Sequence, residues 1–427
     1  MARPAIQPAA VVTSVILTQS DTVPEPLPSA HAPSQRRPWW AFMLALFGFV
    51  LIAGVVVTAL APSKWFVEKP KCLQRDANNA CIDSKQVPVE FALVPADAEA
   101  VEPRLDVQGT PTYTSDGQIY FVTIRQPPIT LLDWLVTRES PAVRYMSYTD
   151  KYGDQTEEQL LQSGQRQMTG AKDRATYVAL KAAGLPVERN EGPAVVDYLI
   201  CLKANQSNTK CEQFVPANDV LKSNDMITEL DGKPVKILDD LSNILKDIEA
   251  GDVVDITVER DGKKIETKVT TIAAPGETPT RTIIGFSPVD TTTVKLPDGV
   301  SVDFETEGIG GPSAGLAFTL TLIDVVTEGN LMGPQRVAVT GEIDIDGNVG
   351  AIGGLSAKAS AVAQVGVKYF LVPKGQPGPG NDPDHPDFDS VEAARKVVGD
   401  RVEIIPVDTL DEALAALKRL GGDPLPT

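Results

Sequence analysis

An uncharged apolar stretch near the start of the chain, Pro38 to Ala61, constrains its folding most strongly. The hydrocarbon core of a bilayer is about 30 Å thick, and a helix needs roughly 20 apolar residues to cross it. This stretch meets that requirement. Trp39 and Trp40 at one end and Trp65 just past the other are typical of aromatic side chains at a membrane interface. The pattern predicts a transmembrane anchor over residues 38–61.

A cleaved signal peptide is the alternative interpretation, because Ala59 to Ala61 resembles a small-residue cleavage site. Two features argue against cleavage. Pro62 would directly follow the cut, and residues 1–37 are long for the segment that precedes the apolar part of a signal peptide. These residues are rich in Pro, Ala, Ser and Thr, which predicts a disordered tail.

Four cysteines form two pairs that are close in sequence, Cys72 with Cys81 and Cys201 with Cys211. Polar residues surround both pairs, which favours two short-range disulfides in an oxidising compartment. A four-cysteine zinc site is the alternative, but it would require two distant segments to meet, and neither contains Cys-x-x-Cys. We therefore expect two disulfides and no metal.

Charge alone leaves the orientation of the anchor undecided. Basic residues flank the apolar stretch on both sides: Arg36, Arg37, Lys64, Lys69 and Lys71. The predicted disulfides favour one orientation, because disulfides persist outside the cytoplasm. We expect a single-pass protein of the cell membrane, with residues 1–37 as a cytoplasmic tail and residues 62–427 extracytoplasmic.

The composition is that of a globular protein with strong negative charge. The chain has 427 residues, 42% of them hydrophobic, which is enough for two or three domains with cores. A net charge of −18 would repel a phosphate backbone, so we expect no nucleic-acid partner. Only two histidines occur, His31 and His385, which argues against a histidine-based catalytic triad and a multi-histidine metal site.

Residues 62–185 read as an extracytoplasmic region of strands followed by helix. Short alternating runs between residues 86 and 125 predict strands. The apolar spacing over residues 156–183 predicts one long helix or two. No chemistry is visible in this region, and we expect its role to be structural.

Residues 186–275 combine hairpins with one helix. Asp231-Gly232 and Asp261-Gly262 predict tight turns between strands, and a helix is expected near residues 238–248. The runs NDMITELDGKPV and GDVVDITVERDGK resemble the second half of a PDZ domain, in which a peptide adds as a strand beside the helix. The first half is less typical, so a blocked or altered groove is the alternative.

Residues 276–427 alternate strand and helix patterns, which predicts a mixed α/β fold. Strands are expected at 301–306, 336–343 and 367–373, helices at 313–326 and 410–417, and a loop followed by a helix at 353–366.

Ser313 is the candidate nucleophile of this segment. Gly311 and Pro312 before it favour a sharp turn, and the small Ala314 after it allows another chain to approach closely. We expect Ser313 to open a helix, where free N–H groups and the dipole stabilise developing negative charge. The alternative is that Ser313 only caps the helix.

Lys358 is the candidate base, because neither histidine is a plausible partner for Ser313. The segment from Gly350 to Val367 carries no other charge, and burial can lower the pKa of a lysine until its amine is neutral. The alternative is a surface lysine whose stem is buried and whose ammonium reaches solvent. Ser207 and Lys210 also fit Ser-x-x-Lys, but they lie in a polar stretch.

The motifs GIGGPSAGLAFTL and VAVTGEIDIDGNVGAIGGLSAKASAVAQVGV, in this order, resemble the proteolytic domain of the Lon proteases, peptidase family S16. The resemblance implies that Ser313 is the nucleophile and Lys358 the base of a Ser-Lys dyad. Further positions are expected to support the dyad: Thr340, Gly311, Pro312 and Ala314.

The order of anchor, strand-rich region, PDZ-like domain and Lon-like domain resembles the bacterial membrane-anchored PDZ-Lon proteins. No G-x-x-x-x-G-K-[ST] motif occurs, so we expect no ATPase module, nucleotide or other cofactor. The resemblance implies an ATP-independent serine endopeptidase that cleaves peptides or unfolded proteins outside the cytoplasm, with the PDZ-like part selecting substrates. A membrane-tethered PDZ scaffold with an inactive protease-like domain is the alternative, and a homo-oligomer is left open. Residues 375–390 read as an insertion that is particular to this chain, and we assign them no functional role.

Overall fold

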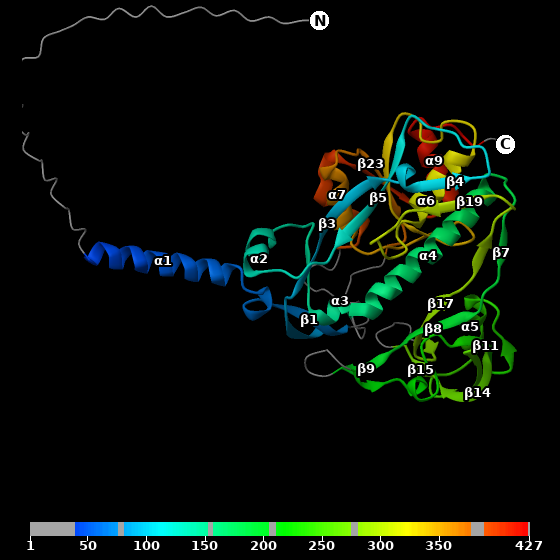
Figure 1. Ribbon diagram of the computed structural model, residues 1–427, viewed down its shortest axis with the longest axis horizontal. Helices are drawn as coiled ribbons and strands as arrows, with labels where there is room; N and C mark the ends of the chain where they lie inside the picture. Colours follow the sequence, from blue (N-terminus) through cyan, green and yellow to red (C-terminus); the bar gives the residue numbers. More distant parts are fainter. Residues whose placement is uncertain are drawn as a thin grey trace, which may run out of the picture. The chain divides into compact units, whose positions relative to one another are not determined.

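The computed structural model describes residues 39–75, 81–152, 157–204, 211–274, 281–376 and 388–425. The chain divides into two compact units, Met1–Val55 and Val56–Thr427, which we describe separately. The first contains most of helix α1, Trp39–Ala59 (Figure 1). The window Phe42–Ala59 has a mean hydropathy of 2.6 and no buried residue, so this helix is long and apolar enough to cross a membrane.

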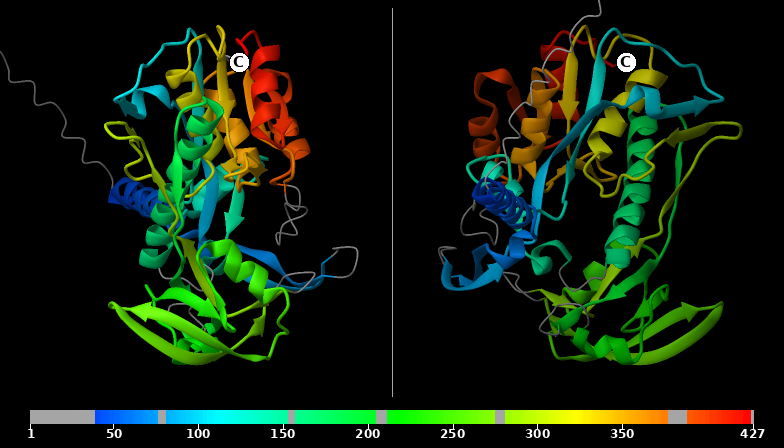
Figure 2. Two further views of the ribbon diagram at one scale, coloured as in Figure 1. Left: turned by 90° about the vertical axis from the view of Figure 1, so that its right-hand side faces the viewer. Right: turned by 60° about the vertical axis from the view of Figure 1, so that its left-hand side comes forward.

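One of the two six-stranded sheets described in the second unit has the strand order β24-β23-β20-β5-β3-β6 (Figures 1 and 2). Strands β5, β20, β23 and β24 run parallel, whereas β3 pairs antiparallel with β5 and β6. The strands are β3 (Phe91–Ala100), β5 (Gln118–Arg125), β6 (Arg144–Met146), β20 (Arg336–Val339), β23 (Tyr369–Pro373) and β24 (Glu403–Val407).

Helices cover both faces of this sheet, which gives three layers (Figure 2). One face packs against α4 (Glu157–Ala182), α6 (Gly315–Val326) and α9 (Leu410–Arg419), and the other against α7 (Leu355–Gln364) and α8 (Val391–Val398). Neighbouring residues of β5 face opposite layers, since Phe121 joins the first cluster and Val122 the second. This arrangement confirms the mixed α/β class.

Residues 62–185 are an integral part of this layered fold. Strand β5 pairs directly with β20, and the single long helix α4 packs against α6. The predicted boundaries at 185 and 276 therefore do not coincide with the edges of the sheet. The sequence alone does not reveal this, because the pairing of β5 with β20 joins segments about half the chain apart.

A second sheet has the strand order β14-β13-β11-β8-β17, with β12 paired to β11. Its elements are β8 (Ala194–Leu199), β11 (Met226–Leu230), β12 (Lys233–Pro234), α5 (Leu238–Leu245), β13 (Val253–Arg260), β14 (Lys263–Thr270) and β17 (Phe286–Asp290). Both predicted Asp-Gly turns are confirmed, with φ of 50° at Asp231 and Asp261 and 72° at the following glycines. Because β17 pairs with β8, the sheet extends past the predicted boundary at residue 275.

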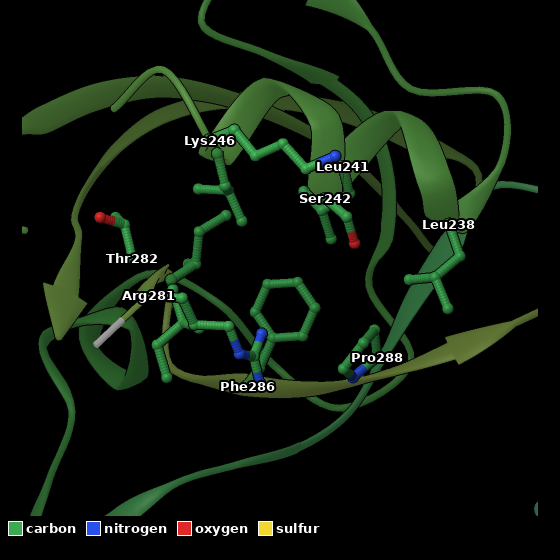
Figure 3. A pocket seen from close by; sticks show the side chains of 11 residues that line it. Leu238, Leu241, Ser242, Lys246, Arg281, Thr282, Phe286 and Pro288 are labelled. Carbon is green, nitrogen blue, oxygen red and sulfur yellow. The ribbon is translucent and has the colours of Figure 1, made fainter. Parts of the chain in front are cut away.

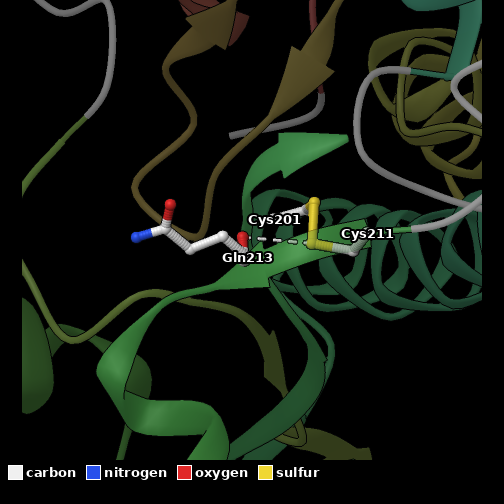
Figure 4. The surroundings of a disulfide bond; sticks show 3 residues. All are labelled: Cys201, Cys211 and Gln213. Carbon is white, nitrogen blue, oxygen red and sulfur yellow. Dashed lines mark hydrogen bonds between the residues drawn. A yellow bond between two sulfur atoms is a disulfide. The ribbon is translucent and has the colours of Figure 1, made fainter. Parts of the chain in front are cut away.

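The cysteines lie on two hairpins, β1 (Glu68–Arg75) with β2 (Cys81–Pro88) and β9 (Cys201–Ala204) with β10 (Cys211–Phe214). Cys201 and Cys211 form a disulfide with a Cα–Cα distance of 5.7 Å (Figure 4). Cys211 Sγ lies 3.1 Å from the carbonyl oxygen of Gln213, a close contact only, since a bonded sulfur carries no proton. Cys81 is also disulfide-bonded, but the side chain of Cys72 lies outside what the structure describes.

Candidate active site

A cleft of about 460 Å³ lies where the start of α6 approaches α7 and strands β3 and β5. Ser313 and Lys358 line it together with Glu342. The region with an expected structural role also contributes: Met168 comes from α4 and Phe121 from β5. The cleft is therefore built by segments from both halves of the second unit.

A sharp turn before α6 positions Ser313. Gly311 has a φ of 90°, a left-handed conformation that favours glycine, and its N–H donates to the carbonyl oxygen of Gly164 at 2.8 Å. Helix α6 begins at Gly315, so the expectation that Ser313 opens the helix is wrong by two residues. Ser313 lies in the turn instead, half-buried, with its hydroxyl at the cleft.

Lys358 lies in the first half of α7 and is only 2% exposed. Its Nζ is 2.6 Å from Ser313 Oγ and 3.0 Å from Thr340 Oγ1. Burial lowers the pKa of Lys358 from 10.5 to about 7, against the opposing charges of Asp389 and Glu342. Burial therefore favours the neutral amine much closer to neutral pH than in an exposed lysine.

Thr340 is fully buried and connects the two candidate residues. Its hydroxyl accepts from Lys358 Nζ and donates to the carbonyl oxygen of Ser313 at 3.1 Å. The N–H of Gly341 donates to the same carbonyl at 2.9 Å. Because Thr340 takes up an N–H of the amine, the lone pair of neutral Lys358 remains available for the Ser313 hydroxyl.

Two backbone N–H groups near Ser313 remain for a ligand. Among the described residues, the N–H groups of Ser313 and Ala314 donate to no protein acceptor. Gly311 and Pro312 offer no N–H group to a ligand. The Gly311 N–H donates to the Gly164 carbonyl oxygen, and proline has no N–H. Ala314 thus presents an N–H without a protein acceptor to the site, whereas Gly311 and Pro312 shape the turn.

Asp389 is a site residue that sequence reasoning missed. Its Oδ1 accepts from the N–H groups of Gly354 at 2.5 Å and Leu355 at 3.2 Å, and its Oδ2 accepts from Arg144 at 3.0 Å. Gly354 cannot cap α7 itself, because it has no polar side chain. Asp389 therefore caps the helix that carries Lys358, although it lies in the loop to which no role was assigned.

Glu342 follows the turn that holds the Ser313 carbonyl. Burial raises the pKa of Glu342, while the charges of Arg174 and Lys358 oppose this effect. Arg174, from α4, also donates through Nε to the carbonyl oxygen of Ile343 at 3.0 Å. Glu342 belongs to the TGEI motif of the sequence. Its position at the cleft could not be predicted from that motif, because it involves the contact between α4 and the next residue, Ile343.

No group of three His, Cys, Asp or Glu side chains that could hold a metal occurs within the described parts of the chain. His31 and His385 both lie outside those parts, as do Ser207 and Lys210.

A second hollow of about 450 Å³ lies between α5 and residues 281–288 (Figure 3). Leu238 and Leu241 line it from the helix, opposite Phe286 and Pro288. Strand β17 is an edge strand of its sheet, and its outer edge pairs with no other strand within the described residues. No described segment fills this groove, so the described residues do not support the alternative of a blocked groove.

Comparison with known proteins identifies two parts of the chain. Residues 293–419 match the Lon protease (S16) C-terminal proteolytic domain, and residues 199–271 match the PDZ domain. A Lon protease of Neorickettsia sennetsu is 38% identical over 24% of this chain and 11% of its own length. One of Vibrio parahaemolyticus is 38% identical over 26% of this chain and 12% of its own length.

The chain thus spans about a tenth of the length of these Lon proteases. A solved PDZ domain of an SdrC-like protein from Listeria monocytogenes is 23% identical, over 23% of this chain and 88% of that one. Its TM-score of 0.18 is too low to carry an argument. The two sequence matches identify what this chain combines: a PDZ domain and a Lon-type proteolytic domain.

Proposed function

We propose that the chain is an ATP-independent serine endopeptidase with a Ser313–Lys358 dyad. The 2.6 Å contact between Ser313 Oγ and the buried Lys358 Nζ is the observation that carries the proposal. A serine hydroxyl becomes a nucleophile when an adjacent base accepts its proton. The absence of G-x-x-x-x-G-K-[ST] from the sequence supports independence from ATP.

The reaction begins with neutral Lys358. The Ser313 hydroxyl gives its proton to Nζ while Oγ bonds to the scissile carbonyl carbon. The N–H groups of Ser313 and Ala314 donate to the oxyanion that forms. Lys358 then gives the proton to the leaving amine as the peptide C–N bond breaks. Water, deprotonated by the same amine, hydrolyses the acyl-enzyme and regenerates Ser313.

Thr340 acts as a positioning residue in this scheme. Its hydroxyl accepts from Nζ and donates to the Ser313 carbonyl, so it orients both partners at once. Asp389 fixes the N-terminus of α7, one turn before Lys358. The base is therefore held by a buried hydroxyl on one side and a capped helix on the other.

The groove beside α5 is the proposed substrate-selection site. An extended peptide can pair with the free edge of β17, while apolar side chains enter the space lined by Leu241 and Phe286. Flexible or C-terminal segments of a protein substrate fit this mode. We assign the groove to residues 186–290, adding β17 to the predicted PDZ-like domain.

We further propose that α1 anchors the chain in the cell membrane, with residues 1–37 in the cytoplasm and the cleft outside it. The apolar helix supports the anchor, and the disulfide of Cys201 with Cys211 supports an oxidising compartment. Full-length protein in intact cells tests the orientation: an impermeant protease added outside should remove residues beyond 62 and spare the tail.

A fluorophosphonate probe tests the dyad. The wild type should be labelled without ATP and should cleave an unstructured protein, whereas Ser313→Ala should do neither. Thr321→Ala provides a matched control, because the buried Thr321 hydroxyl bonds within α6 to the Ala317 carbonyl oxygen and does not line the cleft. A wild type that binds peptides but neither labels nor cleaves would favour the scaffold alternative.

Two neighbouring positions on α5 test the groove. Ser242 lines it, whereas Asn243 is exposed outside it. Ser242→Trp should fill the groove and slow cleavage of a protein substrate by roughly tenfold, equivalent to 1.4 kcal/mol of binding. A short peptide should be cleaved normally, and Asn243→Trp should behave as the wild type. Equal losses with both substrates would argue against substrate selection.

A further inference from the structure

Helix α2, Leu131–Thr137, whose place in the chain Figure 1 shows, presents an apolar face that is exposed within the described structure. Leu132, Leu135 and Val136 are 44%, 47% and 74% exposed. Their spacing of three and four residues places them on one face of the helix. We call these three residues the α2 patch.

The opposite face of α2 packs against the hydrophobic core. Leu131 and Trp134 pack against the buried cluster that includes Val67, Ile129 and Tyr145. The helix N-terminus is also closed, because Thr130 and Asp133 form a reciprocal capping box. Folding therefore does not explain why the outer face is apolar.

A neighbouring segment is also exposed and apolar. The short helix η1, Ser63–Trp65, contacts α2. Trp65 and the next residue, Phe66, are 68% and 53% exposed. The charges nearby are already paired: Lys64 with Glu90, and Arg138 with Glu139.

The backbone fixes α2 close to the end of α1. Helix α1 ends at Ala59, and the carbonyl oxygen of Ala61 accepts from the N–H of Leu131 at 2.9 Å. Two Cα–Cα steps of about 3.8 Å separate Ala59 from Ala61. The start of α2 therefore lies within about 13 Å of the end of α1, once about 5.5 Å for the hydrogen-bonded residue pair is added.

The short distance between the end of α1 and the start of α2 indicates that the α2 patch contacts lipid. The two interfacial layers of a bilayer together add about 10–15 Å to its hydrocarbon core. If α1 crosses the membrane, the α2 patch is held at or next to one of these layers. Amphipathic segments with exposed Leu, Val, Phe and Trp side chains bind there.

We propose that the α2 patch, together with Trp65 and Phe66, inserts into the membrane interface and fixes the second unit against the lipid surface. The proposal rests on α1 being a transmembrane anchor. It gives the chain two membrane contacts that are about 70 residues apart in sequence yet joined by the Ala61–Leu131 hydrogen bond.

A fluorescence experiment on the full-length protein in liposomes tests this. Bimane is attached to a single added cysteine at one of three exposed valines: Val136→Cys in the patch, Val50→Cys in α1, or Val253→Cys on β13. The described cysteines are disulfide-bonded, so the added thiol is selectively labelled. The liposomes contain phosphatidylcholine, phosphatidylglycerol and a lipid with a doxyl quencher.

We expect quenching and a blue shift at positions 50 and 136, and neither at position 253. Leu135→Glu should reduce the quenching at position 136 without changing that at position 50. Quenching at 50 but not at 136 would overturn the interface contact and leave the anchor intact. No quenching at 50 would overturn the anchor and this inference with it, and equal quenching at 136 and 253 would overturn the specific role of the patch.

Discussion

Among the residues that the structure describes, two lysines are buried, and they have opposite surroundings. Lys358, in the cleft, is 2% exposed, and Lys69, on β1, is 8% exposed. Nζ of Lys69 donates to the carbonyl oxygen of Tyr145 at 2.6 Å and lies 3.2 Å from a carboxylate oxygen of Asp150. Nζ of Lys358 contacts two hydroxyl groups, those of Ser313 and Thr340.

The difference separates a lysine that is paired with a carboxylate from the candidate base. Burial would raise the pKa of Asp150, but the hydrogen bond with Lys71 and the charges of Lys69 and Lys71 bring it down to about 2. That carboxylate stays ionised and keeps a positive charge beside it favourable. Lys358 has only more distant carboxylates, so burial dominates and its pKa falls to about 7. Burial therefore lowers the pKa of Lys358 strongly because no carboxylate contacts its amine.

Exchanging each lysine for arginine should have the largest effect. Lys358→Arg should lower kcat/KM for a peptide by at least about 100-fold, because guanidinium does not deprotonate. Lys69→Arg should remain close to the wild type, because it keeps its charge. Circular dichroism would verify that both variants fold. Substantial activity in Lys358→Arg would mean that charge, and not proton transfer, is the role of this residue.

Exchanging each lysine for methionine should change stability in opposite directions. Between pH 7 and 10.5 the unfolded chain binds a proton at Lys358 that the folded chain largely lacks, so this lysine destabilises the fold. The penalty is fully present below about pH 7 and disappears above 10.5. Lys358→Met should therefore raise the free energy of unfolding, by a few kcal/mol at neutral pH and little at pH 10.

Lys69→Met should lower the free energy of unfolding by about 1–3 kcal/mol, because it leaves the Tyr145 carbonyl and part of Asp150 without a partner. Urea unfolding at several pH values measures both changes. A loss of stability in Lys358→Met at neutral pH would show that the amine is not held in its neutral form.

Placing a carboxylate beside Lys358 should make it resemble Lys69. An opposite charge within about 4–6 Å raises the pKa of a lysine by roughly 1–3 units. Thr340→Asp should therefore reduce activity at neutral pH by about tenfold or more, with recovery at higher pH. Thr340→Asn has the same shape without the charge and should show no such pH shift. Equal profiles for the two variants would contradict the electrostatic explanation.

Removing the charge of Asp389 should have the smallest effect. The carboxylate raises the pKa of Lys358, so Asp389→Asn should lower that pKa and move the pH-rate profile toward acid by a fraction of a unit. The asparagine oxygen can still accept from Gly354 and Leu355, so kcat at high pH should be retained. Asp389→Ala removes the cap as well and should lower kcat at every pH, which distinguishes positioning from charge.

The two candidate dyad residues could be singled out from the sequence because their signals are local. Ser313 stands after a Gly-Gly-Pro turn, and Lys358 is the only charge within a long uncharged segment. The hairpins at Asp231 and Asp261 were equally local, because φ above zero at both turn residues favours Asp-Gly. Such features depend on neighbours along the chain.

The residues that sequence reasoning missed depend on contacts across the fold. Arg144 and Asp389 are 245 residues apart, and no periodicity connects them. Strand β5 gave a strand pattern, but nothing in it indicated a parallel pairing with β20. The cap of α7 was hidden for the same reason, since its carboxylate comes from another segment and not from the residue before the helix.

The rate at which a fluorophosphonate acylates Ser313, measured against pH in the full-length protein, tests the central claim most directly. The account predicts a rate that rises with a midpoint near pH 7 and then levels off, as Lys358 becomes neutral. Lys358→Arg should remove this rise. A wild-type rate that increases only near pH 10, or an unchanged profile in Lys358→Arg, would contradict a neutral Lys358 acting as the base of Ser313.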